Sequence, residues 1–225
     1  MISFDCYNNC LNFPFVFVLT YYHNGKEGKN QAKRNSEMKS KCVFATGPES
    51  SGSRLVAKIC SHVLNIQKYG DWNGVGWSNS DHHKVCHRSI PFGIPPRFPN
   101  LEKWISENEK DYEIYFILTT RDTTISEFSR IERFPKTLAE VRKDSKIAKE
   151  LMKQAINSGH KYFIWSYETF MFLREEYLKS LYSFLEVESD FIPLLRDGNE
   201  KRIREKPKMR SRIRNYLQNL VKHLD

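Results

Sequence analysis

A short glycine-bounded stretch has the residue types of an anion-binding loop. Residues 47–54 are GPESSGSR, with an apolar run before them and a helical apolar pattern after them. Backbone N–H groups in such a turn, together with the N-terminus of the following helix, can hold phosphate or sulfate without any particular side chain. Ser51 and Ser53 would add hydroxyl donors, and Arg54 would add a permanent charge. The same pattern also suits an ordinary strand–turn–helix connection.

The loop lacks the side chains of a nucleotide-hydrolysing P-loop. In the pattern G-x-x-x-x-G-K-[ST], Gly47 and Gly52 occupy the two glycine positions. Ser53 stands where the lysine belongs, and Arg54 stands where Ser or Thr belongs. That lysine holds the β- and γ-phosphates, and no apolar strand ending in a metal-binding Asp follows. We therefore expect an anion cradle, and a kinase or ATPase relative stays an alternative.

A second anion-binding pair begins where the next strongly apolar run ends. Arg121 closes the stretch 113–121, and Ser129 follows inside a predicted helix. A guanidinium and a hydroxyl can hold a terminal phosphate from two sides. Ligands of parallel α/β sheets bind beyond the carboxyl ends of the strands, so we expect this pair and the loop at one site. A surface ion pair between Arg121 and Asp122 is the alternative interpretation.

Together the two elements resemble the sulfotransferases that use 3′-phosphoadenylyl sulfate (PAPS). The family's 5′-phosphosulfate loop has the form x-S-G-[ST]-[TR], which residues 50–54 (SSGSR) match, with Arg54 as in the glycan-modifying branch. The family's 3′-phosphate motif, R-D-x-x-x-x-x-x-S, is matched by Arg121, Asp122 and Ser129. Two phosphate motifs in this order, each after a predicted strand, carry the resemblance.

Two later segments extend the resemblance over residues 42–225. FIWSYETF (163–170) looks like the family's strand ending in Tyr-Glu, which suggests Tyr167 near the adenine. LRDGNEKR (195–202) resembles the segment that closes over the 3′-phosphate, which suggests Arg196. The donor-binding residues that the resemblance implies are Ser50, Ser51, Gly52, Ser53, Arg54, Arg121, Ser129, Tyr167 and Arg196.

The implied activity is transfer of a sulfuryl group from PAPS to an acceptor hydroxyl, on a small molecule or a carbohydrate. One departure concerns the leaving group. Much of the family has Lys or Arg before the S-G of the loop, where this chain has Ser50. A cation there would lower the barrier by stabilising the departing phosphate, so a non-catalytic nucleotide- or anion-binding protein is a further alternative.

A second departure concerns the general base. The histidine of many cytosolic members aligns with Ser89, and His87 lies two residues earlier, on the same face of a strand. Imidazole suits the role because its ordinary pKa lies near the working pH, so His87 is the predicted base. His82, His83 and Cys86 could join His87 at a metal, but two are adjacent and no distant ligand pair is evident. No metal is expected.

The elements that must position these residues alternate along the chain. Apolar runs predict strands at 42–46, 84–90, 113–121 and 161–168. Apolar residues at helical spacing predict helices after the loop, over 144–157 and 169–186, and from Pro207 onward. Such alternation predicts a doubly wound α/β fold with a mainly parallel sheet of the P-loop nucleotide-binding type.

Charge and composition suggest one domain with a detached head. Residues 42–195 have no net charge, whereas 196–214 hold nine basic and three acidic side chains and favour an anionic partner. That segment has no aromatic residue, so nucleic acid is not expected. Residues 1–41 are predicted to be a flexible head, and 42–225 a single sulfotransferase-like domain. No apolar run reaches 18 residues, and the five cysteines form no C-x-x-C pair, so a cytoplasmic protein is the expectation.

Overall fold

A five-stranded parallel sheet forms the centre of the computed structural model, which describes residues 39–78, 82–93, 95–195 and 197–200. The strand order is β2-β3-β1-β4-β5, and every neighbouring pair is parallel. This arrangement confirms the predicted doubly wound α/β fold. The strands are β1 (Ser40–Pro48), β2 (Gly70–Asp71), β3 (Lys84–Ile90), β4 (Tyr112–Thr120) and β5 (Lys161–Ser166).

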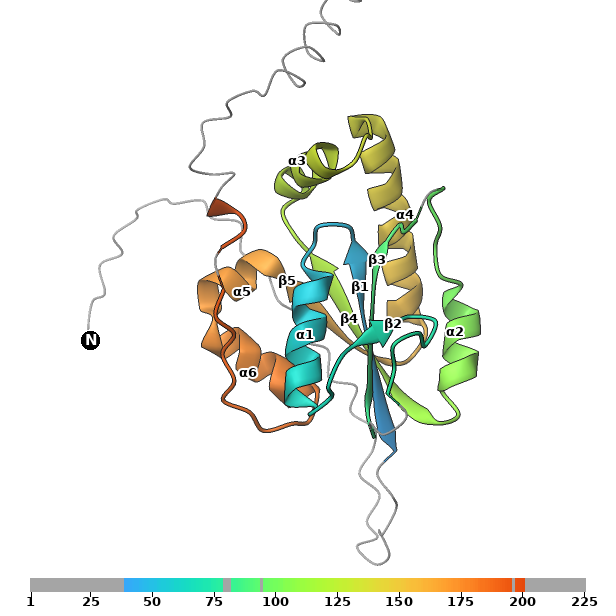
Figure 1. The fold of residues 1–225 in the computed structure, drawn as a ribbon, viewed down its shortest axis with the longest axis vertical. Helices are drawn as coiled ribbons and strands as arrows, with labels where there is room; N and C mark the ends of the chain where they lie inside the picture. The colour runs from blue at the N-terminus through green and yellow to red at the C-terminus, as the bar shows by residue number, and fades with distance from the viewer. Residues whose placement is uncertain (1–38, 79–81, 94, 196, 201–225) are drawn as a thin grey trace, which may run out of the picture. The chain divides into compact units, whose positions relative to one another are not determined.

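Helices cover both faces of this sheet (Figure 1). One layer contains α1, α5 and α6, and the other contains α2 and α4. Helix α3 lies beyond the carboxyl ends of the strands, where the ligands of such folds bind. The helices are α1 (Ser53–Val63), α2 (Leu101–Asn108), α3 (Thr123–Arg133), α4 (Leu138–Asn157), α5 (Tyr167–Leu173) and α6 (Glu175–Phe184).

Strand β1 shows why the sheet is buried on both sides. Its side chains alternate, so Val43 and Ala45 enter the core under α1, α5 and α6, whereas Cys42 and Phe44 enter the core under α2 and α4. All four are fully buried. A strand in the middle of a parallel sheet therefore needs a continuous apolar run, which CVFA supplies.

Several boundaries differ from the sequence pattern. Strand β1 begins two residues before Cys42, and Tyr167 begins α5 instead of continuing β5. The Ser166 side chain causes this change, since it accepts the Thr169 N–H and caps the helix. The helix predicted over 169–186 is two helices, divided at Arg174, whose φ is 48°.

Helix α4 begins six residues before the predicted start at Asp144. Thr137 and Glu140 form a capping box there, in which each side chain bonds to the other residue's N–H. Helix α2, which the apolar pattern did not predict, is capped by Asn100. The predicted head, apart from its last three residues, and the helix predicted from Pro207 lie outside the described residues.

Candidate anion-binding site

The loop between β1 and α1 is fixed by close contacts with its neighbours. A Cβ atom at Gly47 would lie 2.5 Å from the carbonyl oxygen of Thr119, at the end of β4. Gly52 has a φ of 94°, and a Cβ atom there would lie 3.2 Å from the ring of Tyr167. Gly47 is required because a side chain would push the loop away from β4, and Gly52 is favoured because its φ lies where residues with a side chain are strained.

The loop presents backbone donors at the start of α1. Within the part of the chain that the structure describes, the N–H groups of Gly52, Ser53 and Arg54 have no acceptor. Gly52 is the N-cap of α1, and no side chain caps this helix. Three adjacent N–H groups at the positive end of a helix dipole form a cradle for an anion.

Ser51 shapes this loop from inside. Its side chain is buried, and both its N–H and its hydroxyl donate to the Pro48 carbonyl, at 3.1 and 2.6 Å. The same hydroxyl lies 2.6 Å from that of Thr119, which donates to the Thr46 carbonyl. The Ser51 side chain thus joins the loop to β4, and no donor of Ser51 is directed away from the loop.

Ser53, His87 and Ser89 form a polar cluster beside the cradle. The buried Ser53 hydroxyl lies 3.0 Å from His87 Nε2 and 3.2 Å from the Ser89 hydroxyl. His87 and Ser89 come from alternate positions of β3, as predicted. Burial, with a smaller effect of the Arg54 charge, lowers the pKa of His87 to about 4. The imidazole is therefore neutral near pH 7, and it is a weaker base than an ordinary histidine, whose pKa near the working pH is the reason to expect a base at this position.

Acidification should destabilise the fold through His87. Between its folded pKa of about 4 and its ordinary value of 6.5, the unfolded chain binds a proton that the folded chain excludes. Stability is therefore lost as the pH falls, and going from pH 7 to pH 5 should cost about 2 kcal/mol of unfolding free energy. Urea unfolding at both pH values measures this cost. His87→Gln should remove most of this pH-dependent cost, and Arg54→Gln should remove part of it. An equal cost in the parent and in His87→Gln would contradict the assignment of the cost to His87.

Arg121, at the end of β4, connects three segments that lie far apart in the sequence. Its Nη1 donates to the Ser50 carbonyl at 3.0 Å, and its Nε donates to Asn199 Oδ1 at 2.9 Å. Its Nη2 also donates to Asn199 Oδ1, and its guanidinium lies 4.6 Å from the ring centre of Tyr167. The loop, α5 and residues 197–200 therefore meet at this one side chain.

Tyr167 and Glu168 hold the 197–200 segment in place. The Tyr167 hydroxyl accepts the Gly198 N–H at 2.7 Å, and burial raises the pKa of this tyrosine. Glu168 accepts from the Asn199 side chain at 3.2 Å and from the Asp122 N–H at 3.0 Å. Asn199 itself is buried. Sequence reasoning missed Asn199 although it lies within LRDGNEKR, and the predicted Arg196 lies outside the described residues.

Helix α3 faces the core with polar side chains. Its buried residues are Ser126, Ser129 and Arg130, whereas Phe128 is exposed. Ser129 is 9% exposed and has no hydrogen-bond partner among the described residues. Ser129 lies at this end of the sheet, but it makes no hydrogen bond with Arg121. The structure therefore does not bring the two residues of the predicted pair into contact.

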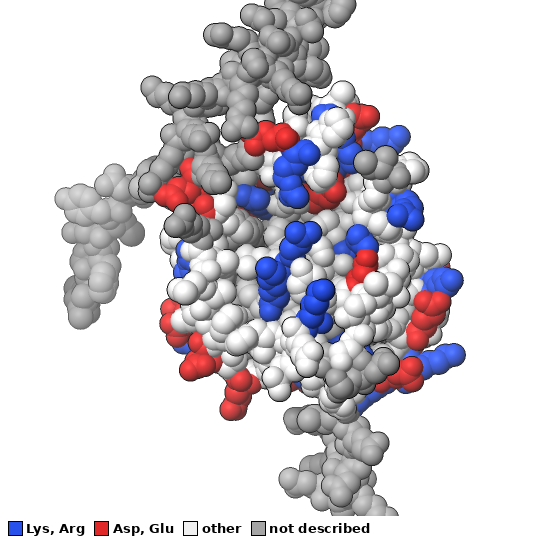
Figure 2. Space-filling view, in the orientation of Figure 1, with Lys and Arg blue, Asp and Glu red and all other residues white. Residues whose placement is uncertain are grey.

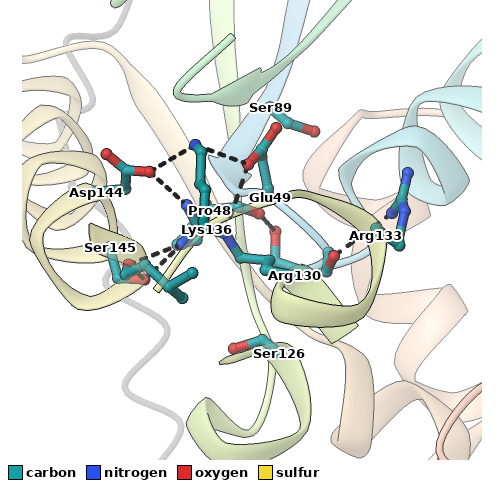
Figure 3. A network of polar contacts seen from close by, with 12 residues as sticks. Pro48, Glu49, Ser89, Ser126, Arg130, Arg133, Lys136, Asp144 and Ser145 are labelled. Carbon is teal, nitrogen blue, oxygen red and sulfur yellow. Dashed lines mark hydrogen bonds and ion pairs between the residues drawn. The ribbon is translucent and has the colours of Figure 1, made fainter. Parts of the chain in front are cut away.

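A buried ionic network ties α3 to α4 and to the loop (Figure 3). Arg130, which is 1% exposed, donates to Asp144 Oδ2 at 2.9 Å and to the Val141 carbonyl at 3.0 Å. Lys136 also donates to Asp144, at 2.8 Å. Arg130 Nε lies 3.4 Å from Glu49 Oε2, in the loop. Burial raises the pKa of Glu49, and the charges of Arg130 and Lys136 oppose that shift.

His82, His83, Cys86 and His87 do not converge on one point. His83 accepts the Lys41 N–H at the opposite end of the sheet, and Cys86 is buried under α2 and α4. In residues 39–78, 82–93, 95–195 and 197–200, no group of three His, Cys, Asp or Glu side chains could hold a metal ion. None of the described helices combines the length and the apolar character that crossing a bilayer requires.

The charge on the outside of the molecule is mixed. Helix α1 presents Arg54 and Lys58 to solvent. Figure 2 shows Lys and Arg side chains gathered over the middle of one face, with Asp and Glu side chains mostly nearer its edges.

Comparison of the chain with protein-family models, with curated proteins and with solved structures gave no match in any of the three.

Proposed function

We propose that the protein is a PAPS-dependent sulfotransferase that binds PAPS at the carboxyl end of the sheet. The observation that carries the proposal is the position of Arg121, which contacts the loop, Tyr167 and Asn199. Four stretches that resemble the sulfotransferase family on sequence alone therefore supply neighbouring groups at one end of the fold. A donor with anionic groups at two separated places matches such a site.

The two ends of the donor would be held by different groups. We assign the 5′-phosphosulfate to the N–H groups of Gly52, Ser53 and Arg54, at the positive end of α1. We assign the 3′-phosphate to Arg121, with Ser129 and Arg196 as further donors, and the adenine to the neighbourhood of Tyr167. A guanidinium suits the 3′-phosphate because it carries a permanent charge and several N–H donors. In the structure Nε and Nη2 of Arg121 both donate to Asn199 Oδ1, so in this proposal the phosphate takes the place of the Asn199 side chain.

In the proposed reaction the acceptor is a small molecule or a carbohydrate with a free hydroxyl. Its oxygen forms a bond to sulfur while the bond between sulfur and the phosphate oxygen breaks, and the electron pair stays on that phosphate oxygen. The acceptor proton passes to a base, for which we propose neutral His87. Neither metal nor nucleic acid has a role in this scheme.

A thermal-shift assay tests the proposal against its alternatives. PAP, the desulfated product, at about 100 times its Kd should add about 2.7 kcal/mol of stability. For a domain of this size the melting temperature should rise by roughly 5–10 °C. Mg-ATP and a short RNA serve as the comparison ligands. A larger shift with Mg-ATP would favour a kinase or ATPase relative, and PAP binding without transfer to any acceptor would favour a non-catalytic nucleotide-binding protein.

A further inference from the structure

Helix α3 contacts the loop from both of its ends. Arg121, just before the helix, donates to the Ser50 carbonyl at 3.0 Å. Arg133, its last residue, lies with Nη1 3.5 Å from the Ser50 hydroxyl. Ser50 has a φ of 68°, in the left-handed region, and stands next to the Gly52–Arg54 cradle. An arginine from each end of α3 therefore reaches the same loop residue.

The charges around the loop leave Arg133 in excess. Glu49 and Asp144 are matched by Arg130 and Lys136, two carboxylates against two cations. Arg133 is exposed, and among the described residues no carboxylate oxygen lies within 4.0 Å of its guanidinium. Its neighbours are the Ser50 hydroxyl and the ring of Phe134. These four paired residues balance without Arg133, which adds a positive charge that also acts on Glu49 and opposes the rise in the pKa of that carboxyl.

The buried face of α3 is polar. Ser129 is 9% exposed and makes no hydrogen bond among the described residues, so its hydroxyl can bond to water or to a ligand, for which we have proposed the 3′-phosphate. Ser129 lies one turn before Arg133, on the side of α3 that also carries the buried Ser126. A helix that buries hydroxyls and an arginine in place of apolar groups suits an anionic ligand.

We propose that Arg133 contacts the anion held by the loop, and supplies the positive charge that the Ser50 side chain lacks. In the proposed sulfuryl transfer, that anion is the departing phosphate. This part of the inference rests on the proposed function. The acceptor oxygen binds sulfur, the sulfur–oxygen bond to phosphate breaks, and the electron pair stays on the phosphate oxygen. Arg133 stabilises this charge as it develops. The acceptor proton passes to His87.

Other arginines near the loop are engaged elsewhere or lie on its other side. Arg130 donates to Asp144, the Val141 carbonyl and Ser145. Arg54 belongs to α1, on the side where its charge lowers the pKa of His87. Arg133 has its guanidinium in contact with the side chain of Ser50, the position at which a loop cation would stand.

The test measures affinity for inorganic pyrophosphate and for PAP by calorimetry, using the full chain. Arg133→Ala should weaken both by about tenfold to a hundredfold, the usual effect of losing one hydrogen bond to a charged group. Arg133→Lys should recover part of the loss. The double variant Arg133→Ala/Ser50→Lys should also recover part of the lost affinity, because the lysine at position 50 returns a positive charge to the anion. Arg142→Ala, which removes an exposed arginine paired with Glu127, is the matched control and should change neither affinity.

The outcomes separate this inference from the proposed function. If PAP binds but Arg133→Ala leaves both affinities unchanged, the inference is overturned and the sulfotransferase proposal stands. If the parent binds pyrophosphate through Arg133 but does not bind PAP, the anion contact stands and the proposed function fails. If Ser50→Lys recovers the affinity lost in Arg133→Ala, the contact is one of charge. If Arg133 only helped to end α3, a lysine in the loop would not recover the affinity.

Discussion

Replacing Arg121 with alanine should lower the affinity for PAP by about 30- to 5,000-fold, or 2–5 kcal/mol, the usual range for truncating one partner of a buried charge pair. The 3′-phosphate would lose a charge-assisted donor, and Asn199 and the Ser50 carbonyl would lose theirs. The guanidinium also stacks on Tyr167, so part of the adenine's surroundings would change as well. Isothermal titration with PAP measures the loss.

A ligand without the 3′-phosphate separates binding from loop shape. If Arg121 acts on the 3′-phosphate, Arg121→Ala should lower the affinity for AMP much less than the affinity for PAP, because AMP senses only the changed surroundings of Tyr167. Arg121→Lys keeps the charge but not the two-pronged geometry, so it should recover only part of the PAP affinity. Arg142→Ala is again the control. Equal PAP affinity in parent and Arg121→Ala would refute the assignment of the 3′-phosphate to Arg121.

Replacing His87 with alanine should cut turnover by roughly 10²–10⁴-fold, the usual contribution of a positioned general base. Its Nε2 lies 3.0 Å from the Ser53 hydroxyl, and burial keeps the ring neutral near pH 7. PAP affinity should change less than about tenfold, because only the contact with Ser53 reaches the loop. Transfer of labelled sulfate from PAPS to a panel of phenols and glycans measures turnover.

The neighbouring histidines supply the control for this experiment. His83 accepts the Lys41 N–H at the far end of the sheet, and His82 lies near Ser40 at that same end. Alanine at either position should leave turnover unchanged. Full activity in His87→Ala, with a loss in either neighbour, would place the base elsewhere. A parent that binds PAP yet transfers sulfate to no acceptor would contradict the proposed reaction while leaving the binding assignments open to their own tests.

The parts of the fold that the sequence predicts well are those with local causes. Strand β3 occupies the predicted range 84–90, and Pro91 directly follows its last residue, Ile90. The alternation of β3 places His87 and Ser89 on one side, since side chains of a strand alternate by geometry alone. The β1–α1 loop was predictable from Gly47 and Gly52, which mark the tight approaches to β4 and α5.

The parts that the sequence does not predict depend on contacts between distant segments. Glu49, Arg130 and Asp144 form one buried network, and as sequence they are ordinary charged residues in a stretch without net charge. The start of α5 at Tyr167 depends on one cap by Ser166, which outweighs a strand-forming pattern. Asn199 could have been noticed from its motif, but its buried bonds to Arg121 appear only in the folded chain.

The polar packing of α3 has a consequence for how the molecule moves. None of its apolar side chains is among its buried residues, and its anchorage to α4 and the loop is ionic and hydrogen-bonded. Sub-global opening costs least where little apolar surface must be exposed, so α3 can lift away at a lower free energy than the sheet can unfold. The helix that carries Arg133 is thus also the segment that should open first, while β1 and β4 keep their pairing.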